Sequence, residues 1–282
     1  MDRVETGPCA SVFFDYDQMK EIRYASLLHD FGKVGVRESV LVKAEKLYPG
    51  DLTLLKARFD FIKRTFEKEA LERKIAVYQY ADPRTLSERL AQIDTDLARQ
   101  LRETDEILQF LLACNVPTVL EQGGFERLHT IAARTYNSYE GPKSFLTAPE
   151  LVSLSIPQGS LTHEDRLEIE SHVTHTFRFL STIPWTSKLK RIPEIAYGHH
   201  EKLDGNGYPR SVAAPAIPIQ TRMMTISDIY DALTAADRPY KKAVPVSQAL
   251  DILGDEARAG KIDAGLLSLF IDAKVYERTG QR

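Results

Sequence analysis

The sequence predicts an all-α protein, and three observations support that prediction. Apolar residues recur at spacings of three and four through most of the 282-residue chain, which is the period of an amphipathic helix. Segments with the alternating pattern of a β-strand are few. Two long helical patterns are joined by a short turn that contains a proline, at residues 81–85, which indicates an antiparallel helical hairpin.

The predicted helices of the first half can be placed in order. The first covers residues 17–31 and ends near Gly32, with Ile22, Ala25 and Leu28 on one face. The hairpin helices follow at 51–80 and from residue 86 onward. Their apolar residues are Leu55, Phe59, Ile62 and Phe66 in the first helix, and Leu86, Leu90, Ile93, Leu97 and Leu101 in the second.

The second half resumes the helical pattern after a looser segment. Residues 123–159 contain several glycines and prolines and one predicted helix, at 125–135. The next helix is predicted to follow Thr162, because Thr162 and Asp165 have the spacing of a capping box. Further helices are predicted just before His199 and at 220–235, 246–259 and 263–276.

Composition excludes several classes of function. The net charge of −3 provides no global positive field, so an anionic ligand needs local charges, and we expect no DNA partner. Cys9 and Cys114 form no CxxC pattern, which argues against a disulfide framework or a thiolate metal site. No apolar run reaches the ~18 residues of a membrane span, and the first residues lack the apolar core of a signal peptide. We therefore expect a cytoplasmic protein.

Five of the seven histidines fall in three short groups on predicted helical ground. The groups are His29, His172 with His175, and His199 with His200. Neutral imidazole is the commonest protein ligand for transition metals, and carboxylates add charge to such sites. Asp30 follows His29 directly, and Asp228 interrupts an apolar helix. Each group alone also fits surface polarity, capping or a core histidine, but their joint occurrence favours a metal site.

Three motifs carry these residues. They are HDFGKVG at 29–35, HHEKLDGNGYP at 199–209 and SDIYDALTAADRPYKKA at 227–243. Together they resemble the signature of the HD-GYP domain, a branch of the HD metal-dependent phosphohydrolase superfamily. The likeness covers about residues 21–60 and 155–280.

This resemblance implies a fold and an activity. The fold is an HD-superfamily helical bundle formed by residues 1–60 and 155–282, with a helical hairpin and a looser connecting segment inserted at 61–154. The activity is hydrolysis of cyclic di-GMP to pGpG or GMP by a metal-activated hydroxide. The resemblance implies two metal ions, sometimes three, and we expect two iron ions, with manganese as the alternative.

Site residues follow from the motif positions that the resemblance matches. The implied metal ligands are His29, Asp30, His172, His199, His200 and Asp228, with Asp30 bridging the two ions. Lys33 is implied to approach the scissile phosphate. Arg238 and Lys241 are implied to bind the dinucleotide.

The glycine-rich loop after the paired histidines has two candidate roles. Gly205, Gly207, Tyr208 and Pro209 form either a rigid turn beside the site or, as proposed for the family, a contact for GGDEF-domain partners. Glycine lets the chain leave the helix sharply. We expect Glu201 and Asp204 to orient the metal ligands.

Two departures from the family pattern leave alternatives open. The family often supplies another ligand upstream of the HD pair, and only Glu5, Asp15, Asp17 and Glu21 are available here, none of them in a motif. The inserted hairpin covers the site, forms a homodimer through its apolar stripe, or binds a regulator. A sensor or adaptor that binds the nucleotide without turnover is therefore the alternative to the enzyme. A phosphohydrolase of the same superfamily that acts on another nucleotide is the third.

Overall fold

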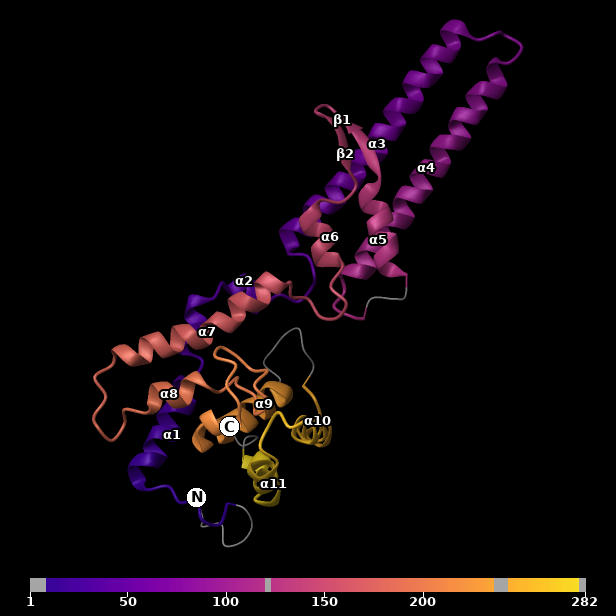
Figure 1. Cartoon of the computed structure of the whole chain (residues 1–282). Coiled ribbons are helices and arrows are strands. Elements are labelled where there is room, and N and C mark those ends of the chain that lie inside the picture. The colour runs from indigo at the N-terminus through magenta and orange to yellow at the C-terminus, as the bar shows by residue number, and fades with distance from the viewer. Residues whose placement is uncertain (1–8, 120–122, 236–242, 279–282) are drawn as a thin grey trace. The chain divides into compact units, whose positions relative to one another are not determined.

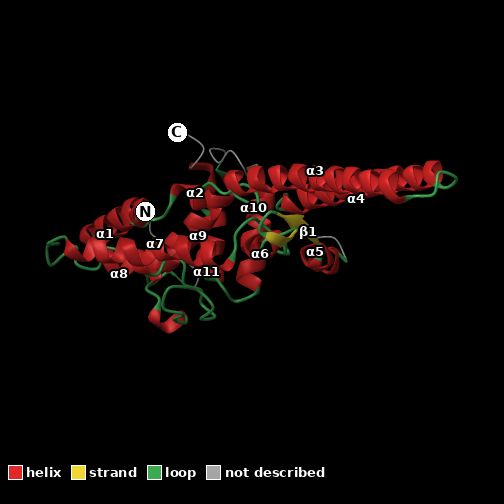
Figure 2. Cartoon of the chain, turned by 90° about the horizontal axis from the view of Figure 1, so that it is seen from above, coloured by secondary structure: helices red, strands yellow, loops and turns green. Residues whose placement is uncertain are grey.

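The structure is a computed structural model that describes residues 9–119, 123–235 and 243–278. The protein is 66% helical, and its described part contains one sheet of two short antiparallel strands, β1 (Thr135–Ser138) and β2 (Gly141–Ser144). Figure 1 labels the elements, and Figure 2 shows how far the helices predominate. The predicted all-α class is confirmed.

The chain divides into two compact units. The first comprises residues 1–41 and 166–282, and the second comprises residues 42–165. A functional division at 60/61 and 154/155, as the sequence suggests, stays a prediction. None of the described helices is long and apolar enough to cross a membrane.

Most elements of the first unit match helices predicted from the sequence. Its α-helices are α1 (Tyr16–Leu28), α2 (Glu38–Leu41), α7 (His163–Thr182, which begins in the second unit), α8 (Ile192–Tyr197), α9 (Ile219–Thr234), α10 (Val246–Arg258) and α11 (Ala264–Asp272). Short 3₁₀ helices are η1 (Phe31–Gly35), η2 (Ala214–Ala216) and η3 (Val275–Arg278). Asp15 begins α1 through a capping box with Gln18, so the first turn of the helix has its free amides satisfied.

Helix α9 lies between the two apolar clusters of this unit. Met224 packs in one cluster, with Ala25 of α1 and Leu180 of α7. Two turns of α9 away, Tyr230 packs in the other cluster, with Phe270 of α11. Asp228 lies on this doubly anchored helix, so its backbone is held from both sides.

The second unit is built around the predicted hairpin. It contains α3 (Pro49–Tyr80), α4 (Leu86–Asn115), α5 (Gly124–Ala133), the two strands and α6 (Ala148–Leu154). Helices α3 and α4 lie side by side and are joined by residues 81–85 (Figures 1 and 2). The apolar stripe predicted on α3 is buried, together with residues of α4, α5 and α6: Leu55, Phe59, Ile62, Phe66, Ile107, Leu111, Leu128 and Leu154.

A buried ion pair joins the two ends of this unit. The Nζ atom of Lys43 lies 2.6 Å from Oδ2 of Asp165, and the two side chains are only 2% and 6% exposed. The Tyr48 hydroxyl donates to the other carboxylate oxygen at 2.6 Å, and Thr162 forms the predicted reciprocal cap with Asp165. Burial opposes ionisation, but the hydrogen bonds from Lys43 and Tyr48 lower the pKa of Asp165 to about 2.

The sequence did not predict α2, α6 or the strands. Helices α2 and α6 have four and seven residues, which is too short to show a helical period. Only Tyr136 is buried in the two strands, so the alternating apolar pattern of a strand is missing.

Candidate metal centre

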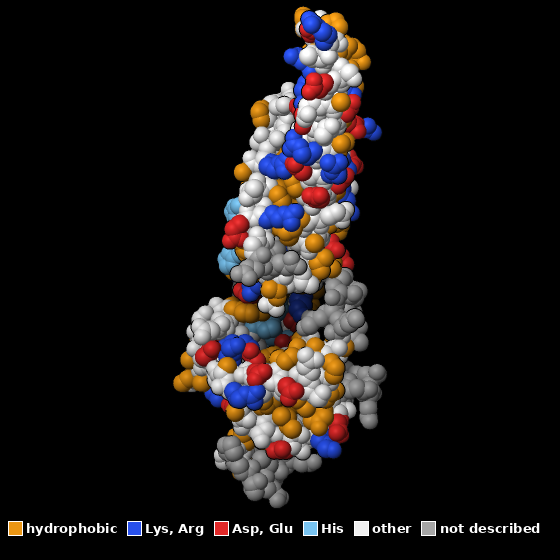
Figure 3. Space-filling model, turned by 90° about the vertical axis from the view of Figure 1, so that its right-hand side faces the viewer, with side chains coloured by type: hydrophobic (Ala, Val, Ile, Leu, Met, Phe, Trp, Pro, Cys, Tyr) orange, Lys and Arg blue, Asp and Glu red, His pale blue; other side chains and the backbone are white. Residues whose placement is uncertain are grey.

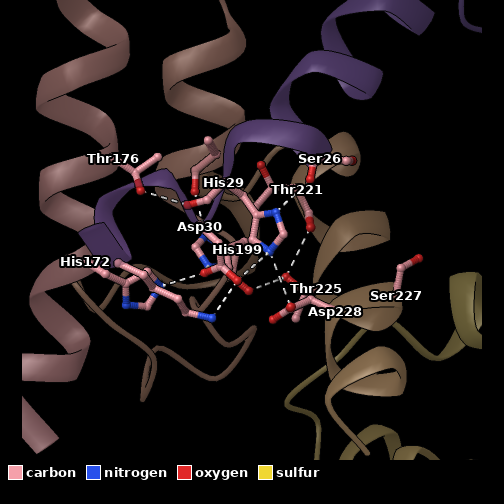
Figure 4. Close-up of polar contacts among 12 residues, drawn as sticks. Ser26, His29, Asp30, His172, Thr176, His199, Thr221, Thr225, Ser227 and Asp228 are labelled. Atoms are coloured by element: carbon pink, nitrogen blue, oxygen red, sulfur yellow. Dashed lines mark hydrogen bonds and ion pairs between the residues drawn. The ribbon is translucent and has the colours of Figure 1, made fainter. Parts of the chain in front are cut away.

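Six predicted ligands converge within the first unit, although the chain brings them from four separate segments. Figure 4 labels five of them, all but His200. His29 ends α1, and Asp30 follows it at the start of η1. His172 lies in the middle of α7, and Asp228 lies on α9. His199 and His200 follow the C-terminus of α8.

The ligand atoms form two overlapping groups. His172, His199 and His200 form the first, and His29, His199 and Asp228 form the second; within each group the ligand atoms lie within 4.8 Å of one another. His199 belongs to both. The Asp30 carboxylate faces both groups, with Oδ1 3.2 Å from His172 Nε2 and Oδ2 3.4 Å from His29 Nε2.

Three of the histidines are oriented in the same way. The Nδ1 atoms of His29, His172 and His199 lie 2.8, 2.5 and 2.7 Å from backbone carbonyl oxygens three residues earlier. A carbonyl oxygen can only accept, so Nδ1 carries a proton in each ring, and in the neutral imidazole Nε2 carries the lone pair. This arrangement aims the three Nε2 atoms into the cluster, as carbonyl oxygens behind the histidine ligands do in metal sites.

The arrangement fits a cation. The buried Nε2 atoms of His172 and His199 have no hydrogen-bond partner within the described residues. His172 Nε2 instead lies 3.2 Å from the Asp30 Oδ1 atom, so two acceptor atoms face each other. Such a contact is repulsive unless a positive charge, a proton or a metal ion, lies between the atoms. Nitrogen and oxygen ligands of this kind suit first-row transition metals.

Electrostatics keep the ligands in the states that a metal requires. Burial and, to a smaller extent, the nearby His29 lower the pKa of His199 to about 4, so the ring is neutral at pH 7. Burial also lowers the pKa of His200. Burial would raise the pKa of Asp30, but the contacts with His172, His29 and Lys33 outweigh it and hold the carboxylate ionised.

In the pair of His29 and Asp228, the interaction between the two side chains outweighs burial and favours the charged form of each. Burial disfavours the charged imidazole, but the hydrogen bond to Asp228 and the charge of Asp30 outweigh it and raise the pKa of His29. Burial likewise disfavours the charged carboxylate, while His29 lowers the pKa of Asp228. Without a metal, a proton on His29 thus takes up part of the negative charge of the two aspartates.

Two threonine hydroxyls fix the backbone that carries the ligands (Figure 4). The fully buried Thr176 donates to the His29 carbonyl at 2.9 Å and accepts from the Gly32 amide at 2.8 Å, so it spans Asp30. Thr225 donates to the His199 carbonyl at 2.8 Å. A Cβ atom at Gly32 would lie 2.0 Å from the His172 carbonyl oxygen, so only glycine fits between η1 and α7. Sequence reasoning missed both threonines, since neither lies in a recognisable metal motif.

Of the basic residues predicted for the substrate, one lies in the described part. The Nζ atom of Lys33 is 2.6 Å from Asp30 Oδ2, at the edge of the cluster. Arg238 and Lys241 lie outside the described residues.

The predicted loop begins beside the ligands. The Tyr208 ring stacks on the His200 imidazole with centroids 4.7 Å apart, and Pro209 follows through a cis peptide bond. Gly205 has a φ of 80°. A Cβ atom at Gly207 would lie 2.3 Å from the Lys202 amide nitrogen, so the loop closes tightly on itself.

The expected role of Glu201 is wrong. Its buried carboxylate accepts from the backbone amides of Arg210 and Val212, at 2.8 and 3.1 Å, and so closes the loop rather than orienting a ligand. Asp204 accepts from the Asn206 amide within the same loop. Backbone carbonyls, not these acids, orient the histidines.

The acids upstream of the HD pair have other partners. Asp15 caps α1, Asp17 pairs with Lys188 at 2.7 Å, and the buried Glu21 accepts from the Arg191 amide at 2.9 Å. Glu5 lies outside the described residues. His175 points instead toward η1, where a Cβ atom at Gly35 would lie 2.7 Å from its Nδ1 atom.

A helical bundle that gathers an HD pair, three further histidines and an aspartate in one cluster is the arrangement that the motifs predict for an HD-type domain, and the cluster could hold metal ions. The family model for the HD domain matches residues 138–266, a span that contains four of the six ligands. The resemblance to the HD-GYP family is confirmed by this match and by the relatives of the chain.

The relatives are bacterial phosphodiesterases of cyclic dinucleotides. A 3'3'-cGAMP-specific phosphodiesterase 3 of Vibrio cholerae serotype O1 is 40% identical over 34% of this chain and 20% of its own length. A cyclic di-GMP phosphodiesterase of Thermotoga maritima is 36% identical over 37% and 27%. One of Pseudomonas aeruginosa is 31% identical over 55% and 30%. The matched segments thus cover less than a third of each of these relatives.

Proposed function

We propose that the protein is a metal-dependent phosphodiesterase that hydrolyses cyclic di-GMP to pGpG, GMP or both. The observation that carries the proposal is the contact between two acceptor atoms, His172 Nε2 and Asp30 Oδ1, within a cluster of four histidines and two aspartates. HD-type domains are metal-dependent phosphohydrolases, and the relatives named above act on cyclic dinucleotides.

The proposed centre is binuclear, with iron as the expected metal and manganese as the alternative. One ion would be held by His29, Asp30 and Asp228, and the other by Asp30 and the remaining histidines: His172, His199 and His200. When bound, the ions supply activation of water and neutralisation of phosphate charge. Asp15, Asp17 and Glu21 are engaged elsewhere, which favours two ions over three.

The protein's own side chains have distinct tasks in this proposal. Lys33 presents an ammonium group at the edge of the cluster, where it would pair with a phosphate oxygen. The stacked Tyr208 ring fixes the plane of His200. Arg238 and Lys241 would bind the dinucleotide, as the motif resemblance implies.

A second substrate is favoured by a specific observation. Two of the relatives, 40% and 32% identical over their matched segments, are named as specific for 3'3'-cGAMP. This cyclic dinucleotide has the same phosphodiester linkage, so the metal chemistry would serve it equally. Discrimination between the two substrates would depend on contacts to the bases.

The test is turnover by metal-loaded protein. Protein stripped of metal and reconstituted with Fe²⁺ without oxygen, or with Mn²⁺, is incubated with each dinucleotide, and the products are separated by chromatography. We expect linear products that disappear in Asp30→Asn and persist in Asp94→Asn, which alters an exposed aspartate of α4. Tight binding of the nucleotide with no turnover in either metal would instead identify a sensor or adaptor, and a GGDEF-domain partner would then be sought at the loop of Tyr208.

A further inference from the structure

The hairpin carries a second apolar row, of which Phe61 reaches the core of its own unit through an edge contact with Tyr136 of β1. Within the described α3 and α4, all the exposed large apolar side chains lie on α3, and none lies on α4. Five of them are 43–66% exposed: Leu54, Phe61, Leu71, Ile75 and Tyr78. Exposed apolar residues scattered over a surface need no explanation, but residues confined to one helix do.

These five residues form one heptad row, which we call the α3 seam. If Ile75 is an a position, Leu54 and Phe61 are also a positions, and Leu71 and Tyr78 are d positions. Tyr80, the sixth exposed apolar residue of α3, lies off this row. A seam of a and d residues is the pattern by which one helix packs against another.

The α3 seam faces away from α4. Phe66 belongs to the buried core shared with α4, and nine residues separate it from Ile75, which is about two and a half helical turns. Ile75 therefore lies on the side of α3 opposite to the core. The two strands lie beside α3, where the Asn137 amide donates to Glu69 at 2.6 Å, and α3 and α4 extend past the strands (Figure 1). Figure 3 shows basic, acidic and hydrophobic side chains interspersed along this part.

Two basic residues interrupt the middle of the seam. Arg64 and Lys68 occupy a d and an a position. Arg64 pairs with Glu67 at 2.7 Å and Lys68 with Glu72 at 3.0 Å, both along α3. Polar residues at such positions specify the register of a helix pair at some cost in stability. Their charges are already balanced on their own helix, so they do not exclude an identical partner.

We propose that the α3 seam is a homodimer interface, in which α3 of a second copy packs against it to form a four-helix arrangement with both hairpins. The five side chains offer roughly 600 Å² per copy. This approaches the ~800 Å² per partner of a stable interface, before their neighbours on the helix are counted. The pairing is independent of the metal centre, so the proposal stands apart from the proposed function.

Sedimentation velocity of the 282-residue chain over about 1–100 µM tests the proposal. We expect a dimer in the wild type. Ile75→Glu places a charge in the apolar contact on both copies and should weaken dimerisation at least about 100-fold. Tyr80→Glu is the matched control, because it makes the same kind of change at an exposed residue off the seam.

Each outcome of this experiment either supports or overturns the proposed homodimer. Ile75 is exposed in the single chain, so its glutamate variant should fold as a monomer, and the helical circular dichroism checks this. Leu71→Glu is the second variant if Ile75→Glu loses helicity. A wild type that stays monomeric at 100 µM overturns the proposal, and so does a dimer that survives both seam variants or dissociates equally in Tyr80→Glu.

Discussion

The buried Thr176 hydroxyl offers a sharp test of how the HD pair is held. Thr176→Val keeps the shape of the side chain and removes its hydroxyl. The hydroxyl makes two hydrogen bonds, to the His29 carbonyl and from the Gly32 amide, and these two residues flank Asp30. The variant therefore leaves a buried carbonyl and a buried amide without partners on either side of the proposed bridging carboxylate.

The size of the effect follows from those two groups. Each unsatisfied buried backbone group costs about 1–3 kcal/mol, so the free energy of unfolding of the first unit should fall by about 3 kcal/mol. Residues that support metal ligands from behind typically change metal affinity by about 10–100-fold. We expect a loss of this order in Mn²⁺ affinity, measured by isothermal titration calorimetry on metal-stripped protein.

Two variants separate this positioning role from general stability. Thr221 is also fully buried, and its hydroxyl donates to the Ile195 carbonyl at 3.0 Å, outside the proposed ligands. Thr221→Val should lower stability by about 1 kcal/mol and leave Mn²⁺ affinity unchanged. Thr176→Ser should restore most of the affinity. The reasoning fails if Thr176→Val binds Mn²⁺ as tightly as the wild type, or if Thr221→Val loses as much affinity.

Two further predictions concern buried carboxylates. Asp165→Asn leaves Lys43 buried without its partner and should lower the free energy of unfolding of the second unit by about 3 kcal/mol at pH 7. The control Asp94→Asn, at an exposed residue, should lower it by less than about 1 kcal/mol. Urea titration measures both changes. The pKa of Asp165 is lowered to about 2 in the folded state, below its ordinary value of 3.8. The ionised carboxylate therefore contributes fully to the free energy of unfolding above pH 3.8, and this contribution is lost as the pH falls from about 4 toward 2. Over that window the free energy of unfolding of the wild type should fall toward that of Asp165→Asn. Glu201→Gln weakens the two hydrogen bonds that close the loop. Hydrogen exchange of the backbone amides of residues 202–212 should then speed up at least about tenfold. Unchanged exchange, or an equal effect of Glu194→Gln at a more exposed residue, would contradict the role of Glu201 in closing the loop.

The sequence predicted which six side chains lie together better than it predicted the scaffold that holds them. Histidine and aspartate are informative because they are costly to bury without a purpose, so their grouping in HD and HH motifs pointed to one site. The structure brings all six together. Thr176 was not predictable in the same way, because a buried threonine has many ordinary roles and its partners lie 147 and 144 residues away in the chain.

The hairpin shows the same limit in another form. Helical spacing predicted α3 and α4 and the buried row that includes Phe59 and Phe66. Leu71 and Ile75 recur at helical spacing too, and periodicity alone does not say which of two rows is buried. The position of α4 determines which of the two rows is buried. The spacing of apolar residues on one helix thus predicts that apolar faces exist, whereas the packing of the neighbouring helix determines which face stays exposed.

The carbonyl contacts of the three histidines have a thermodynamic consequence. Because the three rings are oriented before any cation arrives, folding alone brings the ring nitrogens and two carboxylates together, and a metal ion would replace the proton that His29 holds in its absence. Binding to the folded state alone would stabilise the first unit by about 2.7 kcal/mol at a free metal concentration one hundred times the dissociation constant. Metal supply would then govern how long the folded protein persists, as well as whether it acts.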